Sequence, residues 1–243
     1  MKKIFLLVAV LFLINSISAQ HKTLTLYYPG DSTNVVSITN LDSMVIFICD
    51  VSKVSYGGKD YNTVLIGDQC WFKDNIDVGT QINHGQWPGN NSIIEKYCYN
   101  DLPANCETYG GLYLWDEAVQ YVTTEGPQGI CPDGWHMPTE ADVQTLITSV
   151  GNDGNELKRE DQGTGSGQGT NTSGFSFLLA GGKEYSGGYY SGLGDVGRIY
   201  IGKPGNCGYD CVYSFEVYAT NNTIYFSQGA MPSWGMSVRC IKD

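Results

Sequence analysis

The sequence C-P-D-G-W-H-M-P-T-E-A-D, from Cys131 to Asp142, decides the fold because it combines a turn, a helix start and a cysteine. Thr139 is a candidate N-cap, and Asp142 stands three residues later, where a capping box normally carries Glu or Gln. Apolar residues then recur at helical spacing, and Gly151 provides a C-terminal stop. The sequence therefore predicts an amphipathic helix after Thr139, with a buried stripe formed by Val143, Leu146, Ile147 and Val150.

A second helix is predicted upstream, beginning at Trp115. Its first turn carries Asp116 and Glu117, where the helix dipole favours negative charge. The expected apolar face has the spacing i, i+3, i+4 and i+7 and consists of Trp115, Ala118, Val119 and Val122.

Most of the remaining pattern is typical of short strands. Runs at Tyr61 to Ile66 and Cys70 to Lys73 flank the dipeptide Gly67-Asp68, which predicts a hairpin. Val212 to Ala219 alternates between apolar and other residues, and the side that would face the core carries Tyr213, Phe215, Val217 and Ala219. Asn221-Asn222 then provides a turn, and two further strands are predicted at Thr223 to Phe226 and Trp234 to Ile241.

Two long segments lack a periodic pattern. Asp77 to Glu95 is polar and is predicted to be loop, with Trp87 as a candidate exposed side chain. Gly151 to Gly174 is rich in Gly, Thr, Asn and Ser and is predicted to be a long mobile loop. Within it, the run N-D-G-N-E at 152–156 offers oxygen ligands of the kind calcium prefers, but turns are rich in these residues anyway, and no metal site is predicted.

The N-terminal residues predict export followed by a small β-element. Residues 1–20 have the basic start, apolar run and small-residue end of a signal peptide. Residues 21–52 contain the short alternating runs T-L-T-L-Y-Y, V-V-S-I and M-V-I-F-I and are predicted to form a β-ribbon. No stretch approaches the roughly 20 apolar residues that a transmembrane helix needs. We therefore expect an exported protein in the periplasm, on the cell surface or outside the cell.

Charge and composition exclude several classes of partner. Lys and Arg total 14 against 25 Asp and Glu, which gives a formal net charge of −11. Nucleic acids and anionic membranes are poor partners for such a surface. With 31 Gly, 17 Tyr and only 16% charged residues, the chain is typical of a folded, glycine- and aromatic-rich secreted domain.

The cysteines predict a disulfide framework. All eight lie after the predicted signal peptide, and an even count in an exported chain favours paired disulfides over free thiols. Short spacings favour the pairs Cys98–Cys106 and Cys207–Cys211 as local clips. Spacing alone leaves the pairing of the other four cysteines open.

The chain resembles the Fibrobacter succinogenes major paralogous domain family from about Tyr56 to Asp243. The resemblance is carried, in order, by N-T-V-L-I-G-D-Q-C-W-F-K-D-N, G-L-Y-L-W-D-E-A, C-P-D-G-W-H-M-P-T-E-A-D-V-Q-T-L, T-S-G-F-S-F-L-L-A-G-G and G-M-S-V-R-C-I-K-D. That family looks like a branch of the C-type-lectin-like superfamily. The resemblance implies an α+β, C-type-lectin-like domain at residues 53–243, framed by disulfides, with two helices packed on twisted antiparallel sheets.

The resemblance also implies a bond between Cys131 and Cys240. By the chain-entropy relation, closing a loop of about 110 residues stabilises a fold by roughly 4 to 5 kcal/mol. Cys49 and Cys70 are then left to pair and to tie the ribbon to the domain. The chain departs from the family at R-I-Y-I-G-K-P and N-C-G-Y-D-C, and it lacks the E-P-N, Q-P-D and W-N-D motifs of calcium-dependent sugar-binding lectins.

The best candidate binding residues lie in the Gly-Ser-rich stretch K-E-Y-S-G-G-Y-Y-S-G-L-G-D. Aromatic rings on a loop can stack on sugars or anchor a protein partner, and nearby carboxylates can accept hydrogen bonds from hydroxyls. The alternative is that these tyrosines pack on the sheet as structural residues. The candidate ligand-binding residues are Tyr185, Tyr189, Tyr190 and Asp195, with Glu184 as a possible addition.

Catalysis has little support in the sequence. H-E-x-x-H, G-x-S-x-G, Walker-type and dinucleotide-binding motifs are all missing, and His136 lies in a turn where a structural role is favoured. A remote alternative is a cysteine-dependent enzyme like the formylglycine-generating enzymes, with Cys207 and Cys211 in that role. We expect an exported, non-catalytic binding or adhesion module without a cofactor, which presents loops to a glycan or a surface protein. The alternative is a structural or assembly component of the bacterial envelope.

Overall fold

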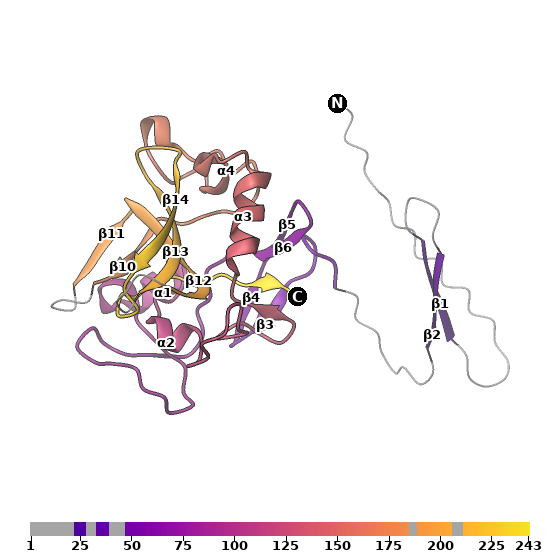
Figure 1. Cartoon of the computed structure of the whole chain (residues 1–243), viewed down its shortest axis with the longest axis horizontal. Coiled ribbons are helices and arrows are strands. Elements are labelled where there is room, and N and C mark those ends of the chain that lie inside the picture. Colours follow the sequence, from indigo (N-terminus) through magenta and orange to yellow (C-terminus); the bar gives the residue numbers. More distant parts are fainter. Residues whose placement is uncertain (1–21, 28–32, 39–46, 185–188, 206–210) are drawn as a thin grey trace. The chain divides into compact units, whose positions relative to one another are not determined.

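The computed structural model describes residues 22–27, 33–38, 47–184, 189–205 and 211–243. The chain forms two compact units, residues 1–47 and 48–243. In the first unit, β1 (Lys22–Tyr27) and β2 (Thr33–Ile38) pair antiparallel, with Lys22 opposite Ile38 (Figure 1). Both strands lie within residues 21–52, where the β-ribbon is predicted. The predicted signal peptide and most of the M-V-I-F-I run lie outside the described residues.

A small sheet in the second unit joins distant parts of the chain. Its strand order is β5 (Thr63–Ile66), β6 (Gln69–Phe72), β15 (Ile241–Lys242) and β9 (Trp135–His136). The hairpin of β5 and β6 confirms the predicted one. Ile241 pairs with Trp71 on one side and with His136 on the other, so the end of the chain lies between the hairpin and the opening turn motif.

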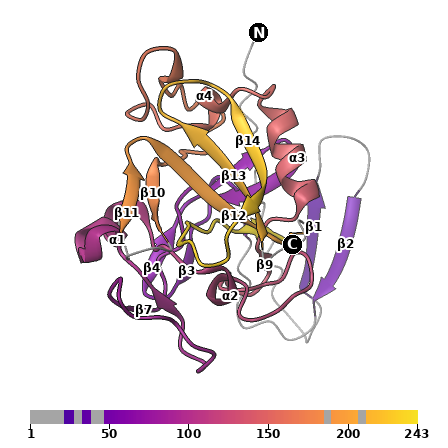
Figure 2. The same cartoon turned by 60° about the vertical axis from the view of Figure 1, so that its left-hand side comes forward.

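A second sheet contributes to the larger apolar core cluster. It consists of β12 (Val196–Pro204), β13 (Val212–Tyr218) and β14 (Ile224–Ala230). The residues predicted to face the core, Tyr213, Phe215, Val217 and Ala219, are buried, but Val212, Ser214 and Glu216 on the other side of β13 are buried as well, so burial does not alternate along this strand. Helix α3 (Glu140–Ser149) packs beside this sheet in both views (Figures 1 and 2). One cluster joins them and includes Val143, Leu146, Ile147, Val150, Ile199, Ile201, Phe215 and Val217.

Helix α3 starts as its sequence predicts. The Thr139 side chain accepts a hydrogen bond from the Asp142 amide, and the Asp142 carboxylate accepts one from the Thr139 amide, so the capping box is complete. The four residues of the predicted stripe are buried. Local chemistry alone therefore fixes where this helix begins and which face it buries.

The helix predicted from Trp115 is much shorter than expected. Helix α2 covers only Trp115–Ala118, because Gln120 and Tyr121 adopt left-handed backbone angles, with φ of 51° and 60°. The predicted apolar face fails at Val122, whose side chain is 43% exposed. No glycine marks this end of the helix, so the helical spacing alone overestimated its length.

Short elements build the rest of the second unit. Two hairpins are formed by β3 (Val54–Tyr56) with β4 (Lys59–Tyr61) and by β10 (Ala180–Lys183) with β11 (Tyr190–Leu193). The segment predicted as loop contains β7 (Thr80–Gln81), which pairs parallel with β8 (Glu95–Lys96). The short helix η1 (Tyr99–Asp101) leads into α1 (Pro103–Tyr109). The predicted strand at 234–241 consists of isolated bridges before β15.

The segment at 151–174 is a folded part of the unit rather than the open loop that was predicted. It contains α4 (Gly154–Leu157) and η2 (Gly165–Gly167). Lys158 is fully buried, and its ammonium group donates to the carbonyls of Gly167, Tyr218 and Asn221. Few apolar residues are needed here, because one buried lysine supplies the hydrogen bonds that hold the backbone.

Arg239 fastens the last segment of the chain in a similar way. It is fully buried and donates to Asn75 Oδ1 at 2.8 Å, to the Phe175 carbonyl and to the Ser176 carbonyl at 2.8 Å. Its guanidinium group lies 4.4 Å from the centre of the Phe175 ring. Burial lowers the pKa of Arg239 to about 9, still above neutral pH, so the side chain remains a cation.

Three disulfides join described residues, and all three are pairs expected above. They are Cys49–Cys70, Cys98–Cys106 and Cys131–Cys240, with sequence separations of 21, 8 and 109. Cys211 is also disulfide-bonded, while Cys207, its expected partner, lies outside the described residues. Cys131–Cys240 ties the start of the α3 region to the final strand, as the family resemblance implied.

Candidate functional site

The hairpin of β10 and β11 brings part of the predicted binding site together. Tyr189 is 73% exposed and lies directly before the return strand β11, and its carbonyl accepts a hydrogen bond from the Glu184 amide at 2.7 Å. Tyr190 is half-buried, with its ring 5.2 Å from that of Tyr99. Its hydroxyl donates to Asp101 Oδ1 at 2.6 Å. Tyr189 is thus a candidate contact residue, whereas Tyr190 is held by its neighbours.

The other predicted residues are not part of this group. Asp195 is exposed in the turn after β11, at the opposite end of that strand from Tyr189. Tyr185 lies outside the described residues. Glu184 accepts a hydrogen bond from the Ser191 hydroxyl at 2.5 Å and so braces the hairpin.

Asp101 joins the hairpin to the loop that precedes β8. Besides Tyr190, it accepts hydrogen bonds from the backbone amide of His84 at 2.9 Å and from its ring Nδ1 at 2.5 Å. Partial burial raises the pKa of Asp101, but the hydrogen bonds from His84 and Tyr190 outweigh this effect, and the net pKa lies below its ordinary value. We call Tyr99, Asp101, His84, Tyr189 and Tyr190 the tyrosine rim.

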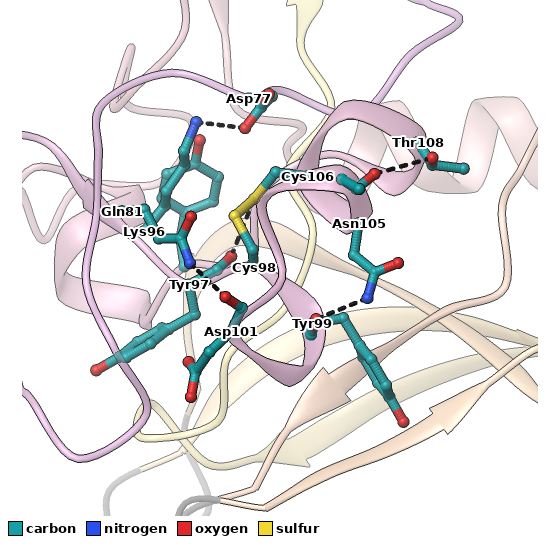
Figure 3. The surroundings of a disulfide bond; sticks show 12 residues. Asp77, Gln81, Lys96, Tyr97, Cys98, Tyr99, Asp101, Asn105, Cys106 and Thr108 are labelled. Atoms are coloured by element: carbon teal, nitrogen blue, oxygen red, sulfur yellow. Dashed lines mark hydrogen bonds and ion pairs between the residues drawn. A yellow bond between two sulfur atoms is a disulfide. The ribbon is translucent and has the colours of Figure 1, made fainter.

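The position of Asp101 depends on an unusual turn closed by a disulfide. Asn100 and Asp101 both adopt left-handed angles, with φ of 56° and 57°, a conformation that costs free energy in residues other than glycine. The Cys98–Cys106 bond closes the chain around this turn, and Gln81 donates to the Asp101 carbonyl at 2.9 Å (Figure 3). The turn is therefore held from two sides, and it directs the carboxylate toward the rim.

Lys183 lies beneath the rim, directly opposite Tyr190 in the hairpin. The lysine is 1% exposed, and its ammonium group has no hydrogen-bond partner among the described residues. Instead it lies 5.0 Å from the centre of the Trp87 ring and 4.6 Å from that of Tyr97. Burial lowers the pKa of Lys183, and the charge of Asp101 partly opposes this. The two rings therefore attract the buried cation in addition to the charge of Asp101.

A groove of about 640 Å³ lies on the outer side of this arrangement. Three segments line it: residues 87–90, residues 114–121 and residues 231–233. Trp87 and Met231 are 54% and 43% exposed, and Leu114 belongs to the small apolar cluster against which Tyr190 also packs. We call this cavity the tryptophan groove.

A buried carboxylate supports the wall formed by Tyr121. Glu117 is 1% exposed, and it accepts hydrogen bonds from the Tyr121 hydroxyl at 3.1 Å and from the Glu95 amide at 3.0 Å. Burial raises the pKa of Glu117, and these hydrogen bonds partly oppose the change. A further hydrogen bond of 3.0 Å, from the Trp115 amide to the Pro232 carbonyl, fixes the third segment.

Comparison with known families identifies the domain. The family model described as the Fibrobacter succinogenes major domain matches residues 64–242. The chain belongs to this family. The matched region falls within the domain predicted at 53–243 and includes both the tyrosine rim and the tryptophan groove. Neither the curated proteins nor the solved structures contain a match.

A second cavity of this family member surrounds His136 and has a volume of about 350 Å³. His136 Nδ1 lies 2.7 Å from Asp243, and Nε2 lies 3.3 Å from Asp142. The hydrogen bond with Asp142 is the largest cause of a raised His136 pKa. Thr139, the nearby hydroxyl, donates to Asp142 rather than to His136. This cluster therefore joins the helix cap to the last strand and does not pair a base with a nucleophile.

The run at 152–156 serves as a helix cap. The Asp153 carboxylate accepts a hydrogen bond from the Asn155 amide at 2.8 Å and caps α4. Within the described ranges, no group of three or more His, Cys, Asp or Glu side chains is arranged to hold a metal ion. In the same part of the chain, no helix is long and apolar enough to cross a membrane.

Proposed function

We propose that this domain is an exported, non-catalytic binding or adhesion module whose ligand, a glycan or a surface protein, contacts the tyrosine rim and the tryptophan groove. The observation that carries the proposal is the pair of exposed rings, Tyr189 and Trp87, on a rigid base. Lys183 supports Trp87 from below, and the hydrogen bond from Tyr190 to Asp101 fixes the strand next to Tyr189. Exposed aromatic side chains on a rigid support lose little entropy on binding.

Export is supported by the disulfides and by membership of a family that suggests a surface or exported domain. We infer further that the fold is C-type-lectin-like. The supporting features are the α+β architecture and the Cys131–Cys240 bond, which links the first helical region to the final strand. The predicted signal peptide would provide the export route.

The binding function is tested with a glycan array and with pull-downs from the native surroundings. The disulfide-intact protein should bind a glycan or capture a partner, and Tyr189→Ala or Trp87→Ala should weaken that binding. Tyr225→Ala is the matched control, because Tyr225 is an exposed tyrosine, 45% accessible, on the separate β12–β13–β14 sheet. The proposal fails if the wild-type protein binds nothing in either assay.

A structural role in the envelope is a second candidate, favoured by the separate N-terminal unit with its β1–β2 hairpin. Deleting residues 21–46 leaves Cys49 and its disulfide in place. Loss of surface retention with unchanged ligand binding would favour this second role. Thiol labelling of the non-reduced protein tests the non-catalytic assignment, because a cysteine-dependent enzyme needs a reactive thiol.

A further inference from the structure

We propose that the tryptophan groove binds an uncharged hexopyranose ring of a glycan, stacked on Trp87, with the Asp116 carboxylate accepting hydrogen bonds from its hydroxyls. This inference rests on the proposed binding function and specifies the ligand class and the residues that select it. It concerns the groove and not the tyrosine rim.

Trp87 provides a stacking surface that is already in place. It is 54% exposed, and the buried ammonium of Lys183 lies 5.0 Å from the ring centre. The loop around it is fixed at both ends, because the Tyr97 hydroxyl donates to the Gln86 carbonyl at 2.6 Å and the Gly89 amide donates to Glu95 at 3.0 Å. A large ring held in this way supplies apolar area for the C–H face of a sugar at little entropic cost.

The charges around the groove select against anions. Asp116 lines the groove and is exposed, and the buried Glu117 lies behind Tyr121. None of the lining residues is Lys or Arg. A uronate, sulfate or phosphate would therefore meet the Asp116 carboxylate, and the lining contains no Lys or Arg to bind it.

Asp116 would attract a cation at the edge of the groove, but a cation stacked on the Trp87 ring itself is disfavoured. Lys183 already occupies a position over Trp87 and draws on the electron density of that ring. A second cation on the exposed part of the same ring would be repelled by the buried ammonium through a region of low dielectric constant. A neutral ring with hydroxyls avoids this repulsion and still provides hydrogen-bond donors for Asp116.

The size and the remaining polar groups fit a sugar. The volume of about 640 Å³ lies within the roughly 300 to 1,000 Å³ typical of small-molecule sites. Asn90 and Ser233, on opposite segments, add donors and acceptors beside the aromatic surface. A few polar groups at the edge of an aromatic surface are the usual way to orient a ligand with many hydroxyls.

The test is isothermal titration calorimetry on the disulfide-intact full chain with defined oligosaccharides. Cello-, xylo-, manno- and laminari-oligosaccharides are the neutral probes, an oligogalacturonate is the anion and an oligoglucosamine is the cation. At least one hexose-based neutral probe should bind, and both charged probes should bind more weakly. Trp87→Ala should weaken neutral binding roughly tenfold or more, as expected for a central aromatic contact, and Trp87→Phe by less.

Two further variants keep the test independent of folding defects. Asp116→Ala removes an exposed side chain and should weaken binding several-fold, while Tyr225→Ala should leave the affinity unchanged. Thermal unfolding by circular dichroism confirms that each variant is folded. The expected pattern is a loss in the Trp87 and Asp116 variants alone.

Each contrary result has a defined meaning. If a neutral sugar binds and Tyr189→Ala abolishes binding while Trp87→Ala does not, the groove is overturned and the proposed function stands. If no sugar binds but a protein partner is captured in a Trp87-dependent way, the ligand class is overturned and the proposed function stands. If the charged probes bind more tightly than the neutral ones, the selection argument is overturned. If nothing binds, both proposals fail.

Discussion

Replacing both cysteines of the Cys131–Cys240 bridge with alanine is expected to destabilise the protein more than the same change at Cys98–Cys106. The two bridges close chain segments with sequence separations of 109 and 8. The chain-entropy relation assigns about 4.8 kcal/mol to the long closure and about 2.5 kcal/mol to the short one at 25 °C. The free energies of unfolding of the two variants should therefore differ by roughly 2 kcal/mol.

The difference between the two variants is more reliable than either loss alone. All four cysteines are 4% exposed or less, so the packing lost when sulfur is removed is similar at both bridges and largely cancels. Urea unfolding followed by tryptophan fluorescence gives each free energy by linear extrapolation. Equal losses, or a larger loss for Cys98–Cys106, would refute the reasoning from loop closure.

The effects on binding should follow the opposite order. The Cys98–Cys106 bond closes the left-handed turn that positions Asp101, and Asp101 holds Tyr190 at the tyrosine rim. The less destabilised variant should therefore bind the ligand more weakly at temperatures where both variants remain folded. Unchanged affinity in that variant would show that the rim does not depend on this turn.

Three further outcomes are expected. Lys158→Met should lower the free energy of unfolding by about 3 kcal/mol in urea titrations. Three backbone carbonyls lose their donor, and this loss outweighs the gain from no longer burying a charge. A more stable variant would contradict this. Tyr190→Phe should cost about 1 kcal/mol at pH 7. The folded-state pKa of Asp101 is lowered, so the stability that the ionised carboxylate contributes is present above about pH 4 and is lost as the pH falls through that lowered value. In that acidic range the free energies of unfolding of Tyr190→Phe and wild type should converge. His136 has a raised pKa in the folded protein, so the stability that the protonated ring contributes is complete below about pH 6.5 and is lost as the pH rises through the raised value. The melting temperature of His136→Gln should therefore lack the decrease that wild type shows over this pH range.

The parts of the fold that could be predicted from the sequence depend on neighbouring residues. The capping box, the stripe of α3 and the β5–β6 hairpin each lie within a short window, where periodicity and turn chemistry act directly. The end of α2 was missed because the left-handed angles that follow it fall on Gln120 and Tyr121, and no glycine or other stop signal in the sequence marks that position.

The proposed binding surface was predictable only in part for the same reason. Composition drew attention to Tyr189 and Tyr190, but Asp101, which positions Tyr190, precedes it by 89 residues. Asp195 is close to them in sequence, yet the extended β11 places it at the other end of the strand. A tryptophan followed by proline in a polar loop was a signal for the groove, and Trp87 was a candidate exposed residue, but nothing local connects it to Asp116.

The prediction of a mobile segment at 151–174 failed because it considered only apolar residues as a source of order. A chain with 31 glycines has many backbone carbonyls outside regular ladders, and buried carbonyls need donors. Lys158 and Arg239 provide several donors each on long stems, so Lys158 reaches carbonyls at Gly167 and at 218–221, and Arg239 reaches the consecutive carbonyls of Phe175 and Ser176. Lys183 is equally buried, but its ammonium lies against the rings of Trp87 and Tyr97 rather than against carbonyls. That difference associates Lys183 with the proposed binding surface: Lys158 and Arg239 hold backbone carbonyls of the scaffold, whereas Lys183 lies against the ring of the exposed Trp87.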